Sequence, residues 1–461
     1  PTGPEGNPIE WFKVADDVTR IDAAVEKVRL LIYNEKIPAK DIAILIAEKA
    51  LEEGDQDRAW THFKQAVDRL MTLQDRDECK PLFLSIILKF SNLSFLLSKG
   101  LTSLEPYLHK AHEVAYDVGD QRSHALINMH IGRLFYFSDR RVDAMAALSV
   151  GLTEVEEIGD EDIFEQAAAF LGMFYLMRGL FREALPHLEK AARLSLKTKQ
   201  IQMKNPMAPV LFSYCLAYLG EFHRAIGSLD CNWRIAKENS DHSLATTLRI
   251  VLSTILYLIK KEEEGEFHLN EGLKEARNSK NDWAIFLAAG PIIFKELHSQ
   301  KGILNAHKVL LQAFPEAASS GFVRQFASPW IMELLYEFEQ RGFEPIPQLS
   351  FQESKERAIN ENNVHLQGVA LRLEAQTKLN EDRPADEIHA DLEKSRDFLE
   401  QSGDIVQLSK ALIVTARIEL SRGNRKNGME GLNKAWTTLG GYADIFFPED
   451  LRHLLDPGRH G

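Results

Sequence analysis

The chain has 461 residues, of which 44% are hydrophobic, and a formal net charge of -13. This charge argues against direct nucleic acid contact, because phosphate contacts need clustered Lys and Arg. No stretch reaches the roughly 18 apolar residues of a membrane span, and the start carries no signal-peptide pattern, so we expect a cytoplasmic protein without membrane contact.

Residues 1–39 do not follow the pattern of the rest of the chain. "IDAAVEKVRLLIYNEK" predicts an amphipathic helix. "IPAKDIAILIAEKA" is compatible with a strand over 42–46 or with a helix that opens the first repeat; the well-formed second half of that repeat favours the helix. As a strand, together with "IEWFKVADD", it faintly resembles a strand–helix–strand piece of UvrD-like helicases, without their nucleotide-binding motifs. We therefore treat 1–39 as an arm and helix that could be the remnant of a preceding domain.

From residue 40 to 440, small residues return at a fixed spacing. The anchors stand in steps of 40, 41, 40 and 41 residues, and they are Ala144, Ala184, Ala225, Gly265 and Ala306. Four residues after each anchor stands a leucine, such as Leu188 after Ala184. A fixed period of 20 to 50 residues indicates a solenoid. With weaker copies, the pattern predicts about ten antiparallel helix pairs.

Close packing explains the residue types. Two antiparallel helices approach closely only where a small side chain faces the partner, and Leu fills the groove beside it. Gly179 and Gly220 suit helix ends that enter the left-handed conformation. An aspartate precedes several first helices and predicts an N-cap; these residues are Asp120, Asp160, Asp241, Asp282 and Asp404.

Two places depart from the repeat. A degenerate unit around Phe351 carries "EPIP" where its corner should stand, so we expect an irregular joint near 342–350. Residues 441–461, which include "FFPEDLRHLLDPGRHG", predict a cap over the last apolar face and then a tail.

The repeat resembles a known family. The residues that carry the likeness are Leu171, Gly172, Tyr175, Gly179, Ala184, Leu188 and Ala191. They match the tetratricopeptide repeat (TPR), and the period near 40 resembles the superhelical sensor region of maltose-activator-like bacterial transcription regulators. The resemblance implies an all-α, right-handed α-solenoid whose first helices line a concave groove.

The sequence contains no catalytic or nucleotide-binding motif. It lacks GxxxxGK[ST], GxGxxG, HExxH, CxxC and GxSxG. We therefore expect no enzyme activity, no cofactor and no metal site. Three cysteines without paired spacing predict reduced thiols.

The predicted groove has an adaptable lining. Met and Tyr suit a peptide, a helix or a small inducer, and Arg or Lys can take an anion. Helical spacing on the first helices selects Met129, Arg133, Tyr136, Phe137, Met173, Met177, Met207, Tyr214, Tyr218, Tyr257, Lys295 and His298. Any one of them could instead belong to the core between repeats.

These features favour a non-catalytic module that binds a peptide, a partner protein or a small inducer. The chain opens at Pro1 without a methionine, so we expect it to be the regulatory part of a larger signalling or transcription-regulatory protein. The alternative is a structural scaffold subunit of a multiprotein assembly. Self-association through exposed terminal units stays open.

Overall fold

The computed structural model describes residues 47, 49–50, 56–71, 77–97, 99–138, 140–198, 208–238, 241–279, 281–297, 302–319, 328–360, 362–381 and 383–455. The regular elements among them are helices. The chain divides into two compact units, Pro1–His130 and Ile131–Gly461. The arm at 1–39, the choice between strand and helix at 42–46, and the tail at 456–461 lie outside the described residues.

In the first unit, three helices pack in sequence. They are α3 (Gln56–Met71), α4 (Lys80–Leu97) and α5 (Leu104–Val118), with short 3-10 turns η1 (Asp77–Cys79) and η2 (Leu101–Ser103) before α4 and α5. Ala59 and Phe63, which stand four residues apart like the anchors and leucines of the later repeats, are fully buried. The Trp60 indole donates a hydrogen bond of 2.8 Å to Ser94 Oγ and ties α3 to α4. Helix α6 (Gln121–Phe137) contains the division between the units.

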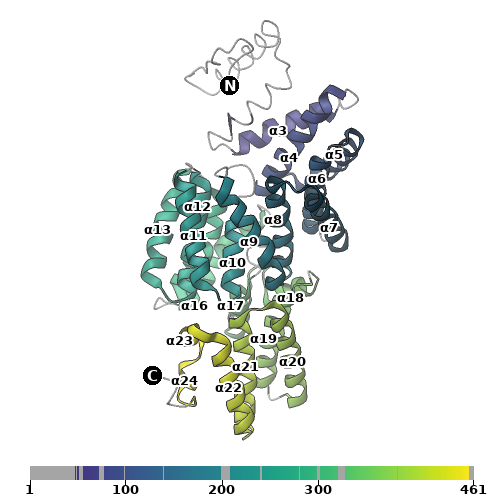
Figure 1. Ribbon diagram of the computed structural model, residues 1–461. Helices are drawn as coiled ribbons and strands as arrows, with labels where there is room; N and C mark the ends of the chain where they lie inside the picture. The colour runs from purple at the N-terminus through teal and green to yellow at the C-terminus, as the bar shows by residue number, and fades with distance from the viewer. Residues whose placement is uncertain are drawn as a thin grey trace. The chain divides into compact units, whose positions relative to one another are not determined.

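The second unit begins with hairpins that stack side by side (Figure 1). In chain order, the helices of these hairpins are α7 (Arg141–Ile158), α8 (Glu161–Met177), α9 (Phe181–Thr198), α10 (Ala208–Tyr218), α11 (Phe222–Glu238), α12 (His242–Leu258) and α13 (Glu262–Ser279). Each packs against the next in the chain. This sequential pairing makes the fold a helical repeat.

The array continues with a broken helix. Pro291 lacks an amide hydrogen and its ring crowds the carbonyl four residues earlier, and α14 ends at that residue, Leu287. The remaining elements are α14 (Asp282–Leu287), α15 (Ala289–Leu297), α16 (Gly302–Ser319), α17 (Pro329–Gln340), α18 (Phe351–Asn360), α19 (Val364–Asn380), α20 (Ala385–Ser402), α21 (Ile405–Ser421), α22 (Arg425–Leu439), η5 (Gly440–Tyr442), α23 (Ala443–Phe446) and α24 (Glu449–Arg452).

The repeat anchors form the contacts that their spacing predicts. Ala144, Ala184, Ala225 and Ala306 are all fully buried. A Cβ atom built on Gly172 would lie 2.5 Å from Cγ of Leu188, so only glycine lets α8 and α9 approach this closely. Over the described residues, the predicted all-α helical repeat is therefore confirmed.

Three of the five predicted caps are confirmed, those of Asp120, Asp241 and Asp404, and one is wrong. Asp241 accepts the amide hydrogen of Leu244 at 3.0 Å, and Asp404 accepts those of Val406 and Gln407. The prediction for Asp282 is wrong. The preceding residue, Asn281, is the N-cap of α14 and accepts the Ala284 amide at 3.0 Å, which leaves Asp282 as the first residue inside the helix.

Between α17 and α18, residues 341–350 form turns and irregular backbone. Two apolar side chains anchor this segment, Ile346 at 3% exposed and Leu349 at 1%. Nε2 of His307 lies 2.8 Å from the carbonyl oxygen of Glu344. The segment is therefore fixed to the helices beside it.

The three cysteines should differ sharply in reactivity. Cys79 and Cys215 are buried and Cys231 is exposed, and burial raises the pKa of the Cys215 thiol to about 12. Because the thiolate is the reactive form, we expect one thiol per folded chain to react quickly with a chromogenic disulfide at pH 8. A Cys231→Ser variant should lose that fast phase, whereas a second fast thiol in the folded protein would contradict the burial of Cys215.

Candidate functional site

Successive first helices bring residues one repeat apart into contact. The Thr377 hydroxyl of α19 donates to the Tyr336 hydroxyl of α17 at 3.1 Å, across 41 residues. The Asn281 amide donates to Ser243 Oγ at 3.0 Å, across 38 residues. The separations match the period of the repeat. Side chains in the same slot of consecutive repeats therefore become neighbours.

One slot of this kind combines aromatic and charged side chains. We call it the central row, and its members follow one another at 38 to 41 residues; they are Arg133, Met173, Tyr214, Thr254, Phe294, Glu333, Arg372 and Lys410. One of these spacings is realised as a direct contact, since Glu333 binds Arg372.

The members of the central row differ in exposure, and Met173, Thr254 and Arg372 are buried. In α12, every residue from Leu244 to Tyr257 is buried. Five members of the row nevertheless keep partial exposure, and these are Arg133, Tyr214, Phe294, Glu333 and Lys410. The row is therefore partly exposed to solvent along the first helices.

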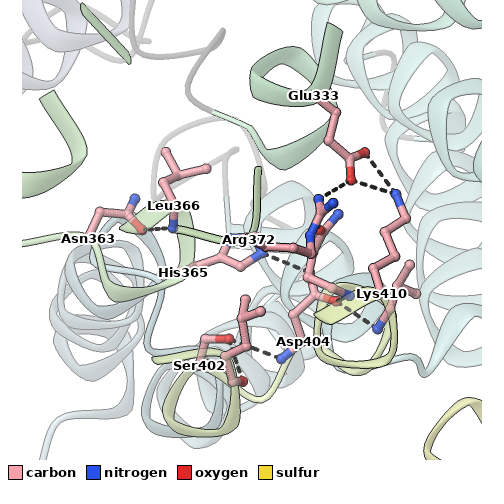
Figure 2. A network of polar contacts seen from close by, with 11 residues as sticks. Glu333, Asn363, His365, Leu366, Arg372, Ser402, Asp404 and Lys410 are labelled. Atoms are coloured by element: carbon pink, nitrogen blue, oxygen red, sulfur yellow. Dashed lines mark hydrogen bonds and ion pairs between the residues drawn. The ribbon is translucent and has the colours of Figure 1, made fainter. Parts of the chain in front are cut away.

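The C-terminal part of the row is an ion-pair cluster of Glu333, Arg372 and Lys410 (Figure 2). The Lys410 ammonium donates to both carboxylate oxygens of Glu333, at 2.7 and 2.8 Å. Nη2 of Arg372 donates to the same carboxylate at 2.5 Å. One carboxylate thus joins two cations from α19 and α21.

The surroundings of the cluster set its ionisation. Burial alone would raise the pKa of Glu333, but the positive charges of Lys410 and Arg372 outweigh burial and hold that pKa below its usual value. Arg372 is nearly buried, with 4% of its side chain exposed, and it also donates to Oε1 of Gln407 at 3.1 Å. Glu333 therefore stays ionised at neutral pH.

A buried histidine–aspartate pair lies beside the cluster (Figure 2). Nε2 of His365 and Oδ2 of Asp404 are 2.8 Å apart, and each side chain is 4% exposed. Asp404 also caps α21 through its other oxygen. Because every oxygen of Asp404 is engaged, this pair fixes α19 to α21 and positions the cluster.

The groove residues predicted on α6, α8 and α10 lie at different depths. Met129 is fully buried and Met173 is 9% exposed. Arg133 extends its guanidinium over the Phe170 ring, 5.4 Å from the centroid, and burial lowers its pKa. Met177 is partly exposed.

The tyrosines and Lys295 are also distributed between surface and interior. Tyr214 is partly exposed, and burial raises its pKa to about 12. The ring of Tyr218 stacks on Phe181 with centroids 4.5 Å apart. Tyr257 is 3% exposed and lies against Gly265. Lys295 forms an ion pair with Glu266.

The other four predicted groove residues have no described side chain. Met207 and His298 lie outside the described residues, and Tyr136 and Phe137 belong to α6 but their side chains are not described. The helical projection of the sequence did not select Glu333, Arg372 and Lys410 as candidate site residues. Reading charges at repeat spacing, rather than one helix at a time, would have found them.

The chain was compared with known proteins. No protein-family model matches it, and no curated protein matches it either. Among solved structures, it is similar to one described as the human IFIT1 dimer with m7Gppp-AAAA, at 13% identity and a TM-score of 0.39, over 96% of this chain and 97% of that one. A circular tandem repeat protein covers 95% of this chain and 98% of its own, at 13% identity and a TM-score of 0.15.

These scores support no further conclusion, so the fold assignment depends on the helix pairing within this chain. None of the described helices combines the length and the apolar composition needed to cross a bilayer.

Proposed function

We propose that the chain is a non-catalytic interaction module that binds a peptide or a segment of a partner protein along the central row. The observation that carries this proposal is the partial exposure of five members of the row, which occupy equivalent positions of the repeat. Met173, Tyr214 and Phe294 supply an apolar and aromatic stretch, and Lys410 supplies a positive charge on a side chain that is 36% exposed. Such a surface suits a peptide with apolar side chains and a carboxylate.

The module would serve as the regulatory part of a larger signalling or transcription-regulatory protein in the cytoplasm. The resemblance of the repeat to TPR sensor regions supports this role, and the net charge of -13 opposes a direct role in binding nucleic acid. A small inducer in place of a peptide would use the same aromatic stretch. A scaffold subunit would bind a folded partner without any response to peptides.

Binding can be tested by thermal unfolding with a library of peptides that contain apolar and acidic residues. A peptide at 100 times its Kd should stabilise the chain by about 2.7 kcal/mol. Tyr214→Ala and Arg133→Ala should each weaken the selected peptide at least tenfold and leave the helical circular dichroism unchanged.

The matched control is Arg234→Ala. Arg234 lies on α11, the second helix of its hairpin, and its side chain is 67% exposed. This variant should bind like the parent. If no peptide raises the melting temperature while a folded protein co-purifies with the chain, the scaffold alternative is favoured. Equal affinity of Tyr214→Ala and the parent would show that the central row is not the binding surface.

A further inference from the structure

Two sets of hairpins that are far apart in the sequence meet end to end within the second unit (Figure 1). Asn363 Nδ2, at the start of α19, donates to the carbonyl oxygen of Met177 at 2.9 Å. The Val364 amide donates to the carbonyl oxygen of Arg178 at 3.0 Å. The C-terminal end of α8 therefore lies against the N-terminal end of α19.

The neighbouring hairpins repeat this arrangement. A Cβ atom on Gly220, which follows α10, would lie 2.1 Å from Cδ1 of Ile405 at the start of α21. Nη1 of Arg182, at the start of α9, donates to the carbonyl oxygen of Glu400 near the end of α20 at 3.0 Å. We call these contacts, between residues 177–223 and 363–446, the end-on contact.

Opposite helix ends attract each other across the end-on contact. The C-terminal end of a helix carries partial negative charge and unpaired carbonyls, whereas the N-terminal end carries partial positive charge and unpaired amides. At α8 and α19 each end supplies the partners that the other lacks. The contact thus depends on hydrogen bonds and dipoles at helix ends.

Aromatic rings complete the contact at its edge. Phe222 lies 4.8 Å from Tyr442 and 5.6 Å from Phe446, measured between ring centroids. The His223 amide donates to the Tyr442 hydroxyl at 3.3 Å. The ring of His365 lies 4.9 Å from that of Phe181.

The hydrophobic cores on the two sides are separate. One cluster of buried residues extends from Phe181 to Ile259, and another from Phe286 to Leu455. The hydrophobic residues that reach the first cluster from the C-terminal hairpins are only partly buried; they are Val406, Tyr442, Ile445 and Phe446. The buried His365 also contacts Phe181 of that cluster. Parting the end-on contact would therefore uncover Phe181 at the edge of the first core and leave the other buried residues of both clusters packed.

From this geometry we propose that the end-on contact is a reversible latch that holds the helical array closed and that opens while both sets of hairpins stay folded. Repeat arrays accommodate such opening because each hairpin contacts mainly its neighbours, so small rotations accumulate along α12 to α17. Opening exposes the rings of Phe222, Tyr442 and Phe446. The latch is independent of what the central row binds.

The test compares two corner glycines with the same backbone conformation. Gly179 has φ of +72°, and a Cβ atom there would lie 2.4 Å from Cβ of His365 and 2.7 Å from its backbone nitrogen. Gly423 has φ of +80°, and a Cβ atom added there would have no other atom within 4 Å. Gly179→Ala and Gly423→Ala thus share the cost of a left-handed alanine, but only Gly179→Ala disturbs the latch.

We expect Gly179→Ala to increase the radius of gyration in small-angle X-ray scattering and to speed hydrogen exchange in the peptide that contains Val364 at least tenfold. Exchange in α12 and in α22 should stay slow, and Gly423→Ala should match the parent. Arg182→Ala, which removes one hydrogen bond without straining a corner, should give a smaller change of the same kind.

Two results would overturn the latch. One is unchanged dimensions and unchanged exchange at Val364 in both Gly179→Ala and Arg182→Ala. The other is exchange at Val364 that rises only together with exchange in α12, because the end-on contact would then belong to a single cooperative unit.

Discussion

Replacing Glu333 with alanine should lower the free energy of unfolding by about 3 kcal/mol. The change leaves Arg372 and Lys410 without their shared carboxylate, and Arg372 is only 4% exposed. Removing one partner of a buried ion pair typically costs about 3–5 kcal/mol. We take the lower end because the Glu333 side chain is 23% exposed. Urea unfolding followed by circular dichroism measures the loss.

Glu337→Ala is the matched control, one helical turn away. Glu337 pairs with Arg341 on the surface of α17, and the two side chains are 39% and 56% exposed. An exposed pair of this kind contributes about 0.5 kcal/mol. Similar losses in the two variants would mean that the ion-pair cluster adds nothing beyond a surface pair.

The same cluster predicts a pH dependence with a definite sign. The pKa of Glu333 is lower in the folded chain than in the unfolded chain. Its contribution is therefore fully present above the unfolded value of about 4.5 and is lost as the pH falls through the folded value. Between pH 5 and 3 the parent should lose more stability than Glu333→Gln does. If the parent and Glu333→Gln lost the same stability over this pH range, the assignment of the pKa shift to this carboxyl group would be contradicted.

Local features of the fold were predictable from the sequence. Ala184 and Leu188 define a hairpin through their spacing alone, because the contact between α8 and α9 joins residues close in the chain. The same applies to Asp241 and Asp404 as caps. The prediction of Asp282 as a cap failed because two residues that can cap a helix, Asn281 and Asp282, stand side by side. The sequence does not show which of them precedes the first turn.

The end-on contact was not predictable by such reasoning. Gly179 and Gly423 both appear as corner glycines, yet only Gly179 lies against another hairpin, at His365. Gly179 and His365 are 186 positions apart, and no spacing in the repeat connects them. Curvature that accumulates over many hairpins decides which corner meets which helix end.

Helical projection was also a weak guide to the predicted groove. It works where one face of a helix is apolar and the other polar. The first helices are covered on several sides, as the continuous burial of α12 shows, so Tyr257 received the same weight as Tyr214. Comparing equivalent slots separates them, because Tyr214 belongs to the central row and Tyr257 does not.

The packing rule behind the repeat predicts opposite effects for two glycine-to-alanine changes within helices. Alanine is the better helix former by about 1 kcal/mol. At Gly227, an exposed position of α11 with no atom within 4 Å of a Cβ, the change should stabilise the chain by about 1 kcal/mol. At Gly172, overpacking should cost about 2–3 kcal/mol, so the net effect is a loss.

The reason for the loss at Gly172 is that the obstacle cannot move aside. The new Cβ would lie 2.5 Å from Cγ of Leu188 and 3.2 Å from its backbone nitrogen, and Leu188 is fully buried. Thermal unfolding of both variants beside the parent measures the two signs. Stabilisation by Gly172→Ala would show that α8 and α9 do not need a glycine to pack, and that the small residues of the repeat have another cause.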